Sequence, residues 1–226
     1  MRPDVNAVEV TGRLVDAIRM LARADIVDYS GHGSARRDTE SFYINSAGAA
    51  RGALTTDDIV IVDLDGRLVA GNASPPFEFH IHSEIYRVRP DVHAIMHTHP
   101  RWSTFLTMVG AQYQVVYAQG ALLGGVPLFD SPLSVNTRPM GEKVAAALGH
   151  GPALLLKSHG AVVVGSDVVE SFALAAYLEE NAYRQYMAMQ IGDPYVFSDA
   201  EQQAFRERLW TPSGFRKTWD HYHSKL

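Results

Sequence analysis

The 226-residue sequence contains no cysteine. Disulfides, thiolate nucleophiles and cysteine-ligated zinc are therefore excluded, so any metal must be bound by histidine or by carboxylates. The sequence also lacks an apolar run long enough to span a bilayer, and it has no basic run of the kind that binds nucleic acid. No apolar segment follows Met1 that would resemble a signal peptide. We therefore expect a cytoplasmic protein that binds neither nucleic acid nor a membrane.

The composition is that of an ordinary folded protein, with 46% hydrophobic and 20% charged residues. A chain of this length can bury a sizeable core without disulfides or metals. We find no internal repeat, low-complexity tract or linker that would divide it. The sequence therefore predicts one domain over residues 1–226 that ends in a C-terminal helical tail.

Hydrophobic periodicity predicts alternating helices and strands. Hairpin signals favour antiparallel pairing, and the interspersed helices favour layers on both faces of one sheet. The turn at residues 29–36 leads into a strand, and a polar, aromatic segment follows residue 210. The predicted helices are 5–24, 79–89, 102–109, 141–148, 166–189 and 199–210. The predicted strands are 41–45, 58–64, 67–70, 93–97, 114–117, 126–129, 153–157 and 161–164.

The segment His97-Thr98-His99-Pro100 closes an apolar run and is the strongest indication of chemistry. Alternate residues of a strand point to one face, so His97 and His99 present both imidazoles to the same place. His159 lies in a comparable setting after Leu154-Leu155-Leu156. Three converging imidazoles are typical of a divalent-metal site. The first hypothesis is a metal enzyme.

Glu78 is our candidate for the fourth ligand. It stands where a proline-rich loop enters a predicted helix, and such junctions can project a side chain into a cleft. A simpler interpretation is a helix N-terminal carboxylate that the helix dipole favours. The pattern alone does not separate these two roles.

In combination these residues resemble the class II aldolase/adducin family. The resemblance implies a three-layer α/β/α fold around a mostly antiparallel sheet, and a homotetramer with active sites at subunit interfaces. It also implies that His97, His99 and His159 bind the metal, and that Glu78 either ligates it or moves a proton. The motifs that carry the resemblance are Gly31-His32-Gly33-Ser34-Ala35-Arg36, Glu78, Ile85-Tyr86-Arg87-Val88-Arg89-Pro90-Asp91-Val92, His97-Thr98-His99 and Ser158-His159-Gly160.

Departures from the pattern of the family's sugar-phosphate aldolases bear on the substrate. Those enzymes hold phosphate with an asparagine, a Thr-Gly pair and two serines, and the matching positions here are His32, Ala47-Gly48 and Pro76-Phe77. Alanine and phenylalanine side chains offer no hydrogen-bond donor, and proline lacks even a backbone N–H. Each lost bond to a charged group costs about 1.5–3 kcal/mol. We therefore expect a substrate without phosphate.

Aromatic and cationic side chains take the place of those donors. A planar hydroxylated aromatic carboxylate suits such a pocket better than a sugar does. The Pro-Phe-Glu segment is also similar to the family's decarboxylases of dihydroxyphthalate and hydroxypyridine-dicarboxylate type. Phe77 and Phe79 can equally be ordinary core residues. The candidate walls are Phe77, Phe79, Tyr117 and Trp102, and the candidate polar contacts are His32, His80 and Arg36.

The sequence thus predicts a metal-dependent decarboxylase of a non-phosphorylated, hydroxylated aromatic or heteroaromatic acid. Zinc and manganese suit the ligands, and iron or cobalt also fit. The carbon that loses carbon dioxide must receive a proton, and the candidate donors are Tyr117, Glu78 and His80. Tyr117 aligns with a tyrosine that reaches the site across a subunit boundary in the family's aldolases. His82 suits a packing or hydrogen-bonding role.

Two alternatives stay open from the sequence. The first is a metal-dependent aldolase for an unphosphorylated hydroxy-acid or sugar. The second is a non-catalytic, adducin-like interaction module, although adducin-type domains do not keep a complete set of metal-site residues.

Overall fold

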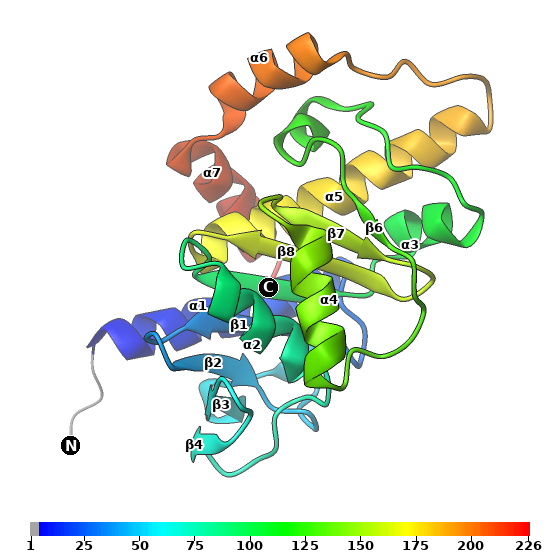
Figure 1. The fold of residues 1–226 in the computed structure, drawn as a ribbon. Helices are drawn as coiled ribbons and strands as arrows, with labels where there is room; N and C mark the ends of the chain where they lie inside the picture. The colour runs from blue at the N-terminus through cyan, green and yellow to red at the C-terminus, as the bar shows by residue number, and fades with distance from the viewer. Residues whose placement is uncertain (1–4) are drawn as a thin grey trace.

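The computed structural model describes residues 5–226, with side chains from residue 7 onward. A mixed sheet of eight strands forms the centre, in the order β4-β3-β2-β1-β5-β8-β7-β6 (Figure 1). Neighbouring strands pair antiparallel except β6 with β7, which are parallel. The strands are β1 His32–Arg36, β2 Ser41–Asn45, β3 Ile59–Asp63, β4 Leu68–Ala70, β5 Ala94–Thr98, β6 Leu128–Phe129, β7 Ala153–Leu156 and β8 Gly160–Gly165.

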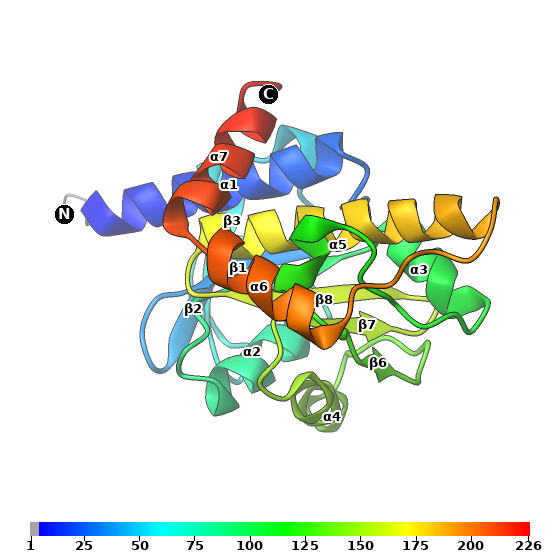
Figure 2. The same cartoon turned by 90° about the horizontal axis from the view of Figure 1, so that it is seen from above.

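Helices cover both faces of the sheet. Figure 2 shows α1, α5 and α7 on one side and α2 and α4 on the other. This arrangement confirms the predicted α/β/α layers around a mostly antiparallel sheet. The helices are α1 Val5–Arg23, α2 Phe79–Val88, α3 Arg101–Met108, α4 Arg138–Leu148, α5 Val168–Met189, α6 Asp199–Leu209 and α7 Pro212–His223, with short 3-10 turns η1 Arg51–Ala53, η2 Thr56–Asp58 and η3 Ala118–Leu122.

Strand alternation divides the core into two halves. On β5, Ala94 and Met96 join the cluster beneath α1 and α5, whereas Ile95 joins the cluster beneath α2 and α4. Successive side chains of a strand point to opposite faces, which accounts for the division. His97 therefore follows Ile95 toward the α2 side, where it is fully buried.

The predicted strand at residues 114–117 is wrong. The segment is extended but pairs with no strand. Side chains of α5 bind its backbone instead: Asn181 accepts from the N–H groups of Val116 and Tyr117 and donates to the carbonyl of Gln114. Gln185 accepts from the N–H of Gln114 and donates to the carbonyl of Gln112, just before the segment. Its backbone groups are satisfied without a ladder, so the β-like residue pattern does not produce a strand.

The segment after residue 210 is helical. The Thr211 side chain accepts a hydrogen bond from the N–H of Gly214 and so caps α7, and Pro212 occupies the first turn. Phe215 and Trp219, four residues apart, are both buried. Within residues 5–226, no helix is long and apolar enough to cross a membrane.

Candidate metal centre

The two central strands bring the three predicted histidines to one place. His97 lies on β5 opposite Val162 of β8, and His99 follows the end of β5. His159 lies in the turn between β7 and β8, immediately before Gly160. A Cβ atom on Gly160 would lie 2.2 Å from the Thr98 carbonyl oxygen. Only glycine permits this approach of the turn to β5, which brings His159 beside the other two histidines.

Glu78 is the residue immediately before α2, and its side chain reaches the same place. Its Oε1 accepts hydrogen bonds from the Ser134 hydroxyl at 2.8 Å and the Val135 N–H at 2.7 Å. Its Oε2 lies 3.4 Å from Nε2 of His97 and 3.5 Å from Nε2 of His159. One ligand atom from each of Glu78, His97, His99 and His159 lies within 4.8 Å of the other three.

The hydrogen bonds of the histidines fit a metal ion at this cluster. Nδ1 of His97 lies 3.0 Å from the Ala161 carbonyl, and Nδ1 of His99 lies 2.9 Å from the Asp28 carboxylate. Both partners only accept, so each Nδ1 carries a hydrogen, and in a neutral ring Nε2 then presents a lone pair. The two Nε2 atoms are 3.1 Å apart. A cation bound by both relieves this repulsion, and ligands of a tetrahedral ion lie about 3.4 Å apart.

Asp28 is a supporting residue that the sequence did not reveal. Besides His99, its carboxylate accepts from the backbone N–H groups of Ser30 and Gly31. Burial opposes its ionisation, but these hydrogen bonds hold the pKa of Asp28 below its usual value. A carboxylate behind a ligating imidazole fixes the ring and strengthens it as a ligand. No spacing rule connects residue 28 with residue 99, so only the folded chain shows this contact.

The pKa shifts of Glu78 and His97 favour the protonation states in which these side chains can bind a metal. Burial raises the pKa of Glu78, but the nearby rings of His159 and His97 and the hydrogen bond from the Val135 N–H outweigh it and hold that pKa well below the ordinary range. Burial lowers the pKa of His97. A carboxylate and a neutral imidazole are the forms that bind a metal.

A cavity of about 300 Å³ opens beside Glu78. Of the predicted substrate contacts, His32 and Phe77 line it, and Phe77 is 85% exposed there, so it is not a core residue. The volume suits a small organic molecule. The lining residues are Tyr29, Ser30, His32, Ala47, Arg51, Pro76, Phe77, Glu78 and Ser134.

The structure does not bring Arg36 or Phe79 into this cavity. The Arg36 guanidinium donates to the carbonyls of Val92, Tyr86 and Arg89 and stacks on the Tyr86 ring. Its donors therefore bind the protein's own backbone. Phe79 packs against the core beneath α2 and α4. Its ring lies against Gly66 and fills the space that a side chain at that position would need.

Two of the predicted proton donors lie outside the cavity lining of this chain. His80 is on α2, where its ring contacts that of Phe79. Burial lowers the pKa of His80, and the charges that act on it belong to Glu84 and Arg138. The ring of Tyr117 lies under the Arg184 guanidinium, 3.8 Å from it, beside α5. Within one chain, Glu78 alone of the three lines the cavity.

Arg51 also lines the cavity, although no motif or spacing in the sequence singles it out. Its Nε donates to the Gly31 carbonyl, and its Nη1 donates to the carbonyls of Ser46, Ala47 and Ala49. Among residues 5–226 no acceptor is recorded for Nη2. Burial lowers the pKa of Arg51 and nearby Asp28 raises it, but guanidinium stays charged at neutral pH. Arg51 therefore carries a fixed positive charge at the cavity.

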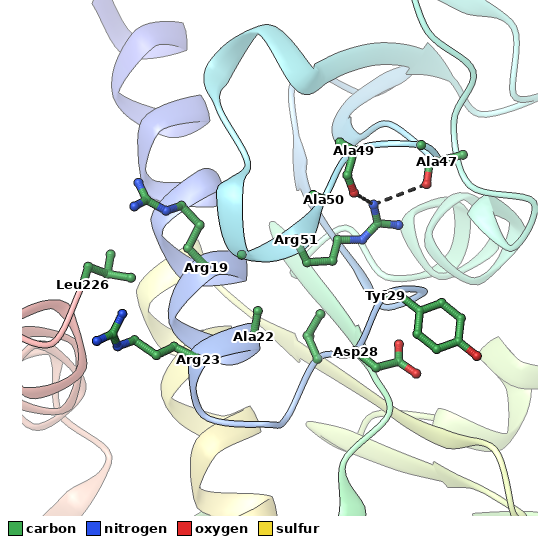
Figure 3. Close-up of a pocket in the computed structure, with 13 residues that line it drawn as sticks. Arg19, Ala22, Arg23, Asp28, Tyr29, Ala47, Ala49, Ala50, Arg51 and Leu226 are labelled. Atoms are coloured by element: carbon green, nitrogen blue, oxygen red, sulfur yellow. Dashed lines mark hydrogen bonds between the residues drawn. The ribbon is translucent and has the colours of Figure 1, made fainter.

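A larger cavity of about 600 Å³ adjoins this one and shares Tyr29, Ala47 and Arg51 with it. Figure 3 shows Arg51 and Tyr29 on one side, opposite Arg19 and Arg23 of α1. The four candidate metal ligands do not line this larger cavity. Arg51 is thus the cation shared by both spaces.

Comparison with known families decides how this arrangement is classified. The sequence matches the Class II Aldolase and Adducin N-terminal domain over residues 12–186, which include all four members of the cluster. The chain belongs to this family. Because class II aldolases use a divalent metal, membership supports a metal ion at the cluster.

The relatives include proteins named as aldolases and proteins named as decarboxylases. An L-fuculose phosphate aldolase of Methanocaldococcus jannaschii is 31% identical over 68% of this chain and 82% of its own length. A 3,4-dihydroxyphthalate decarboxylase of a Terrabacter species is 30% identical over 75% of this chain and 77% of its own. Both names denote carbon–carbon lyases, which supports a lyase here.

Solved structures agree on the fold. An L-fuculose 1-phosphate aldolase from Glaciozyma antarctica superposes with a TM-score of 0.87, covering 100% of this chain and 92% of its own, at 22% identity. At that identity, the likeness supports the fold alone.

Proposed function

We propose that the protein is a metal-dependent decarboxylase of a non-phosphorylated, hydroxylated aromatic or heteroaromatic carboxylic acid. The observation that carries the proposal is the chemistry of the cavity beside Glu78. It combines the Phe77 ring, the charge of Arg51 and a buried histidine, His32, next to the candidate metal ligands. The similarity to 3,4-dihydroxyphthalate decarboxylases supports the same substrate class.

The cavity's own residues account for binding of such an acid. Phe77 offers a flat apolar face to an aromatic ring. Arg51 has an Nη2 without a recorded acceptor in the described part of the chain, and a carboxylate of the substrate would satisfy it. Pro76 and Ala47 provide no side-chain donors where the sugar-phosphate enzymes of the family have hydroxyl groups.

His97, His99, His159 and Glu78 would hold the ion, which supplies Lewis-acid stabilisation of negative charge on a substrate oxygen. Zinc and manganese both suit this donor set, and so do iron and cobalt. Glu78 is positioned either as a fourth ligand through Oε2 or as a group that moves a proton. Ser134 and Val135 hold its Oε1 and so fix the carboxylate in either role.

The exposed carbon needs a proton after carbon dioxide leaves. Glu78 is the candidate within one chain, because it lines the cavity. Its lowered pKa keeps it a carboxylate, so it would first take the proton of a substrate hydroxyl group and then deliver that proton to this carbon. Tyr117 would have to come from a neighbouring subunit, and His80 would need access from the start of α2. Individual substitutions Tyr117→Phe and His80→Gln separate these candidates by their effect on turnover.

A product assay tests the proposal. Purified, metal-loaded protein is incubated with a panel of dihydroxyphthalates and hydroxypyridine-dicarboxylates, and released carbon dioxide and the decarboxylated product are measured. Release from at least one compound, abolished in Glu78→Ala, is the expected result. No release from any member of the panel would contradict the proposed substrate class.

The second candidate function is an aldolase, and several similar relatives are named as L-fuculose phosphate aldolases. Arg51 could bind the anionic group of an aldol substrate as well as a carboxylate. The same assay separates the two functions, because an aldolase yields an aldehyde and a ketone without carbon dioxide. An adducin-like module without chemistry would yield neither, and it would retain no stoichiometric metal.

We also propose a cytoplasmic, single-domain protomer that assembles into a homotetramer with sites at subunit interfaces. Exposed apolar side chains at the ends of two adjacent helices support assembly, because such surfaces are usually covered. Light scattering of the purified protein measures the state directly. The side chains are Phe105, Met108 and Val109 at α3, and Met187, Met189 and Ile191 at α5.

A further inference from the structure

A buried chain of polar groups runs from the cavity into the core beneath α2. Nδ1 of His32 lies 2.7 Å from Nε2 of His82, and Nδ1 of His82 lies 2.6 Å from the Ser34 hydroxyl. The Ser34 hydroxyl lies 2.8 Å from that of Tyr86. All four side chains are at most 3% exposed. None of the four is among the candidate metal ligands.

Each group in this chain carries one mobile hydrogen. His32 and His82 are at most 2% exposed, and neither has a carboxylate among its hydrogen-bond partners, so both rings are neutral. Burial raises the pKa of Tyr86, so its phenol keeps its proton. Four hydrogens and three contacts allow three arrangements: all three bonds point toward the cavity, all three point toward Tyr86, or the Ser34 oxygen accepts from both His82 and Tyr86.

The three arrangements differ in which hydrogen lacks an acceptor. If the Ser34 oxygen accepts from both neighbours, its own buried hydrogen has none, because His82 and Tyr86 are its only partners in residues 5–226. If the bonds point toward Tyr86, its phenol hydrogen has none, because Ser34 is its only recorded partner in residues 5–226. The Phe42 ring and the Arg36 guanidinium also surround Tyr86, and neither accepts a conventional hydrogen bond. If the bonds point toward the cavity, the unmatched hydrogen is on Nε2 of His32. His32 lines the cavity, where a bound molecule can supply the acceptor, whereas a buried phenol or hydroxyl donor would stay unpaired.

His32 is the open end of the chain. Its Nε2 is buried and has no hydrogen-bond partner in the described part of the molecule, and the residue lines the cavity beside Glu78. A buried N–H without a partner is rare in folded proteins and calls for an acceptor. A carboxylate or phenolate oxygen of the bound molecule would supply it.

We propose that Tyr86, Ser34 and His82 form a hydrogen-bond relay of fixed direction that makes His32 an Nε2–H donor to an oxygen of the substrate. Tyr86 donates to Ser34, Ser34 to Nδ1 of His82, and Nε2–H of His82 to Nδ1 of His32. His32 is the residue that touches substrate, and the other three are positioning residues. The choice of a carboxylate or phenolate oxygen rests on the proposed function, whereas the direction of the relay does not.

Neutron diffraction from a crystal of the deuterated, metal-loaded protein tests the direction. We expect deuterium on Nε2 and not Nδ1 in both His32 and His82, with the Tyr86 deuterium directed at Ser34. Deuterium on Nδ1 of His32 would overturn the proposal. This measurement needs no substrate, so its outcome is independent of whether the protein releases carbon dioxide.

A pair of variants tests the effect of the relay on the bound molecule. His82→Leu removes the donor to His32, whereas the amide of His82→Gln can still donate to Nδ1. With whichever acid the product assay identifies, we expect kcat/KM to fall about tenfold to a hundredfold in His82→Leu and to recover at least partly in His82→Gln. Equal losses in both variants, with circular dichroism unchanged, would show that His82 acts only through packing and would overturn the relay.

Discussion

At His97, the two ring nitrogens have separate roles. Nδ1 donates to the Ala161 carbonyl of the neighbouring strand, which leaves Nε2 for an ion. We expect His97→Ala to lose bound metal and at least 99% of activity while remaining folded, because a core of this size does not need the ion. Elemental analysis and circular dichroism measure the two outcomes. A variant with normal metal content and turnover would exclude the proposed centre.

Arg51 allows a second test at the scale of single residues. Since its Nη2 is available at the cavity, Arg51→Gln should raise KM for the acid about 10–100-fold while changing kcat less. Arg19→Gln is the matched control, because Arg19 lines the larger cavity but not the one beside Glu78. Steady-state kinetics give both constants. An unchanged KM in Arg51→Gln would remove this residue from substrate binding.

Single residues also show the limits of prediction from sequence. Strand alternation suffices to bring His97 and His99 together, because that rule is local. Arg51 and Asp28 could not be selected in this way. Their partners are backbone groups and a histidine that only the folded chain places near them. For Arg36 the reverse holds: its charge suggested a substrate contact, but three carbonyls of its own chain occupy it.

At the scale of elements, side chains of α5 supply the backbone hydrogen bonds that a neighbouring strand would otherwise give to residues 112–117. Asn181 alone makes three hydrogen bonds to this segment and is fully buried. Asn181→Ala leaves those backbone groups without partners, so we expect a loss of about 2–4 kcal/mol in the free energy of unfolding. Urea denaturation measures it. A loss below 0.5 kcal/mol (roughly the value for a surface substitution) in Asn181→Ala would contradict this role.

The elements that periodicity predicts well are those whose backbone bonds are internal or lie in a regular ladder. Helix α5 and strands β2, β5 and β7 fall close to their predicted positions for this reason. Residues 114–117 have a strand-like composition but no neighbouring strand, which sequence alone could not show. Helix α7 was harder to recognise, because its buried face consists of little more than Phe215 and Trp219.

At the scale of the whole molecule, buried histidines make the free energy of unfolding depend on pH. The pKa of His82 falls to about 3 through burial, whereas that of an unfolded histidine is near 6.5. Between these values the unfolded chain binds more protons, so stability is fully present above about pH 6.5 and is lost as the pH falls toward 3. We expect a loss on the order of 3 kcal/mol by about pH 4.

Urea unfolding of metal-free protein at several pH values measures this dependence. His82→Gln removes the titrating ring, so its stability should vary less with pH than that of the wild type over the same range. An identical pH dependence in the two proteins would show that His82 does not contribute. Metal-free protein is required, because a bound ion would add its own dependence on pH.

The position of β5 inside the sheet has a consequence for how long the protein retains an ion. The strand lies between β1 and β8, with three further strands beyond β1 and two beyond β8. Edge strands exchange their amide hydrogens through local opening, whereas interior strands generally do so only when the whole domain unfolds. We therefore expect the amide of His97 to be among the slowest to exchange, and fraying of β4 or β6 would leave the backbone of this candidate ligand in place.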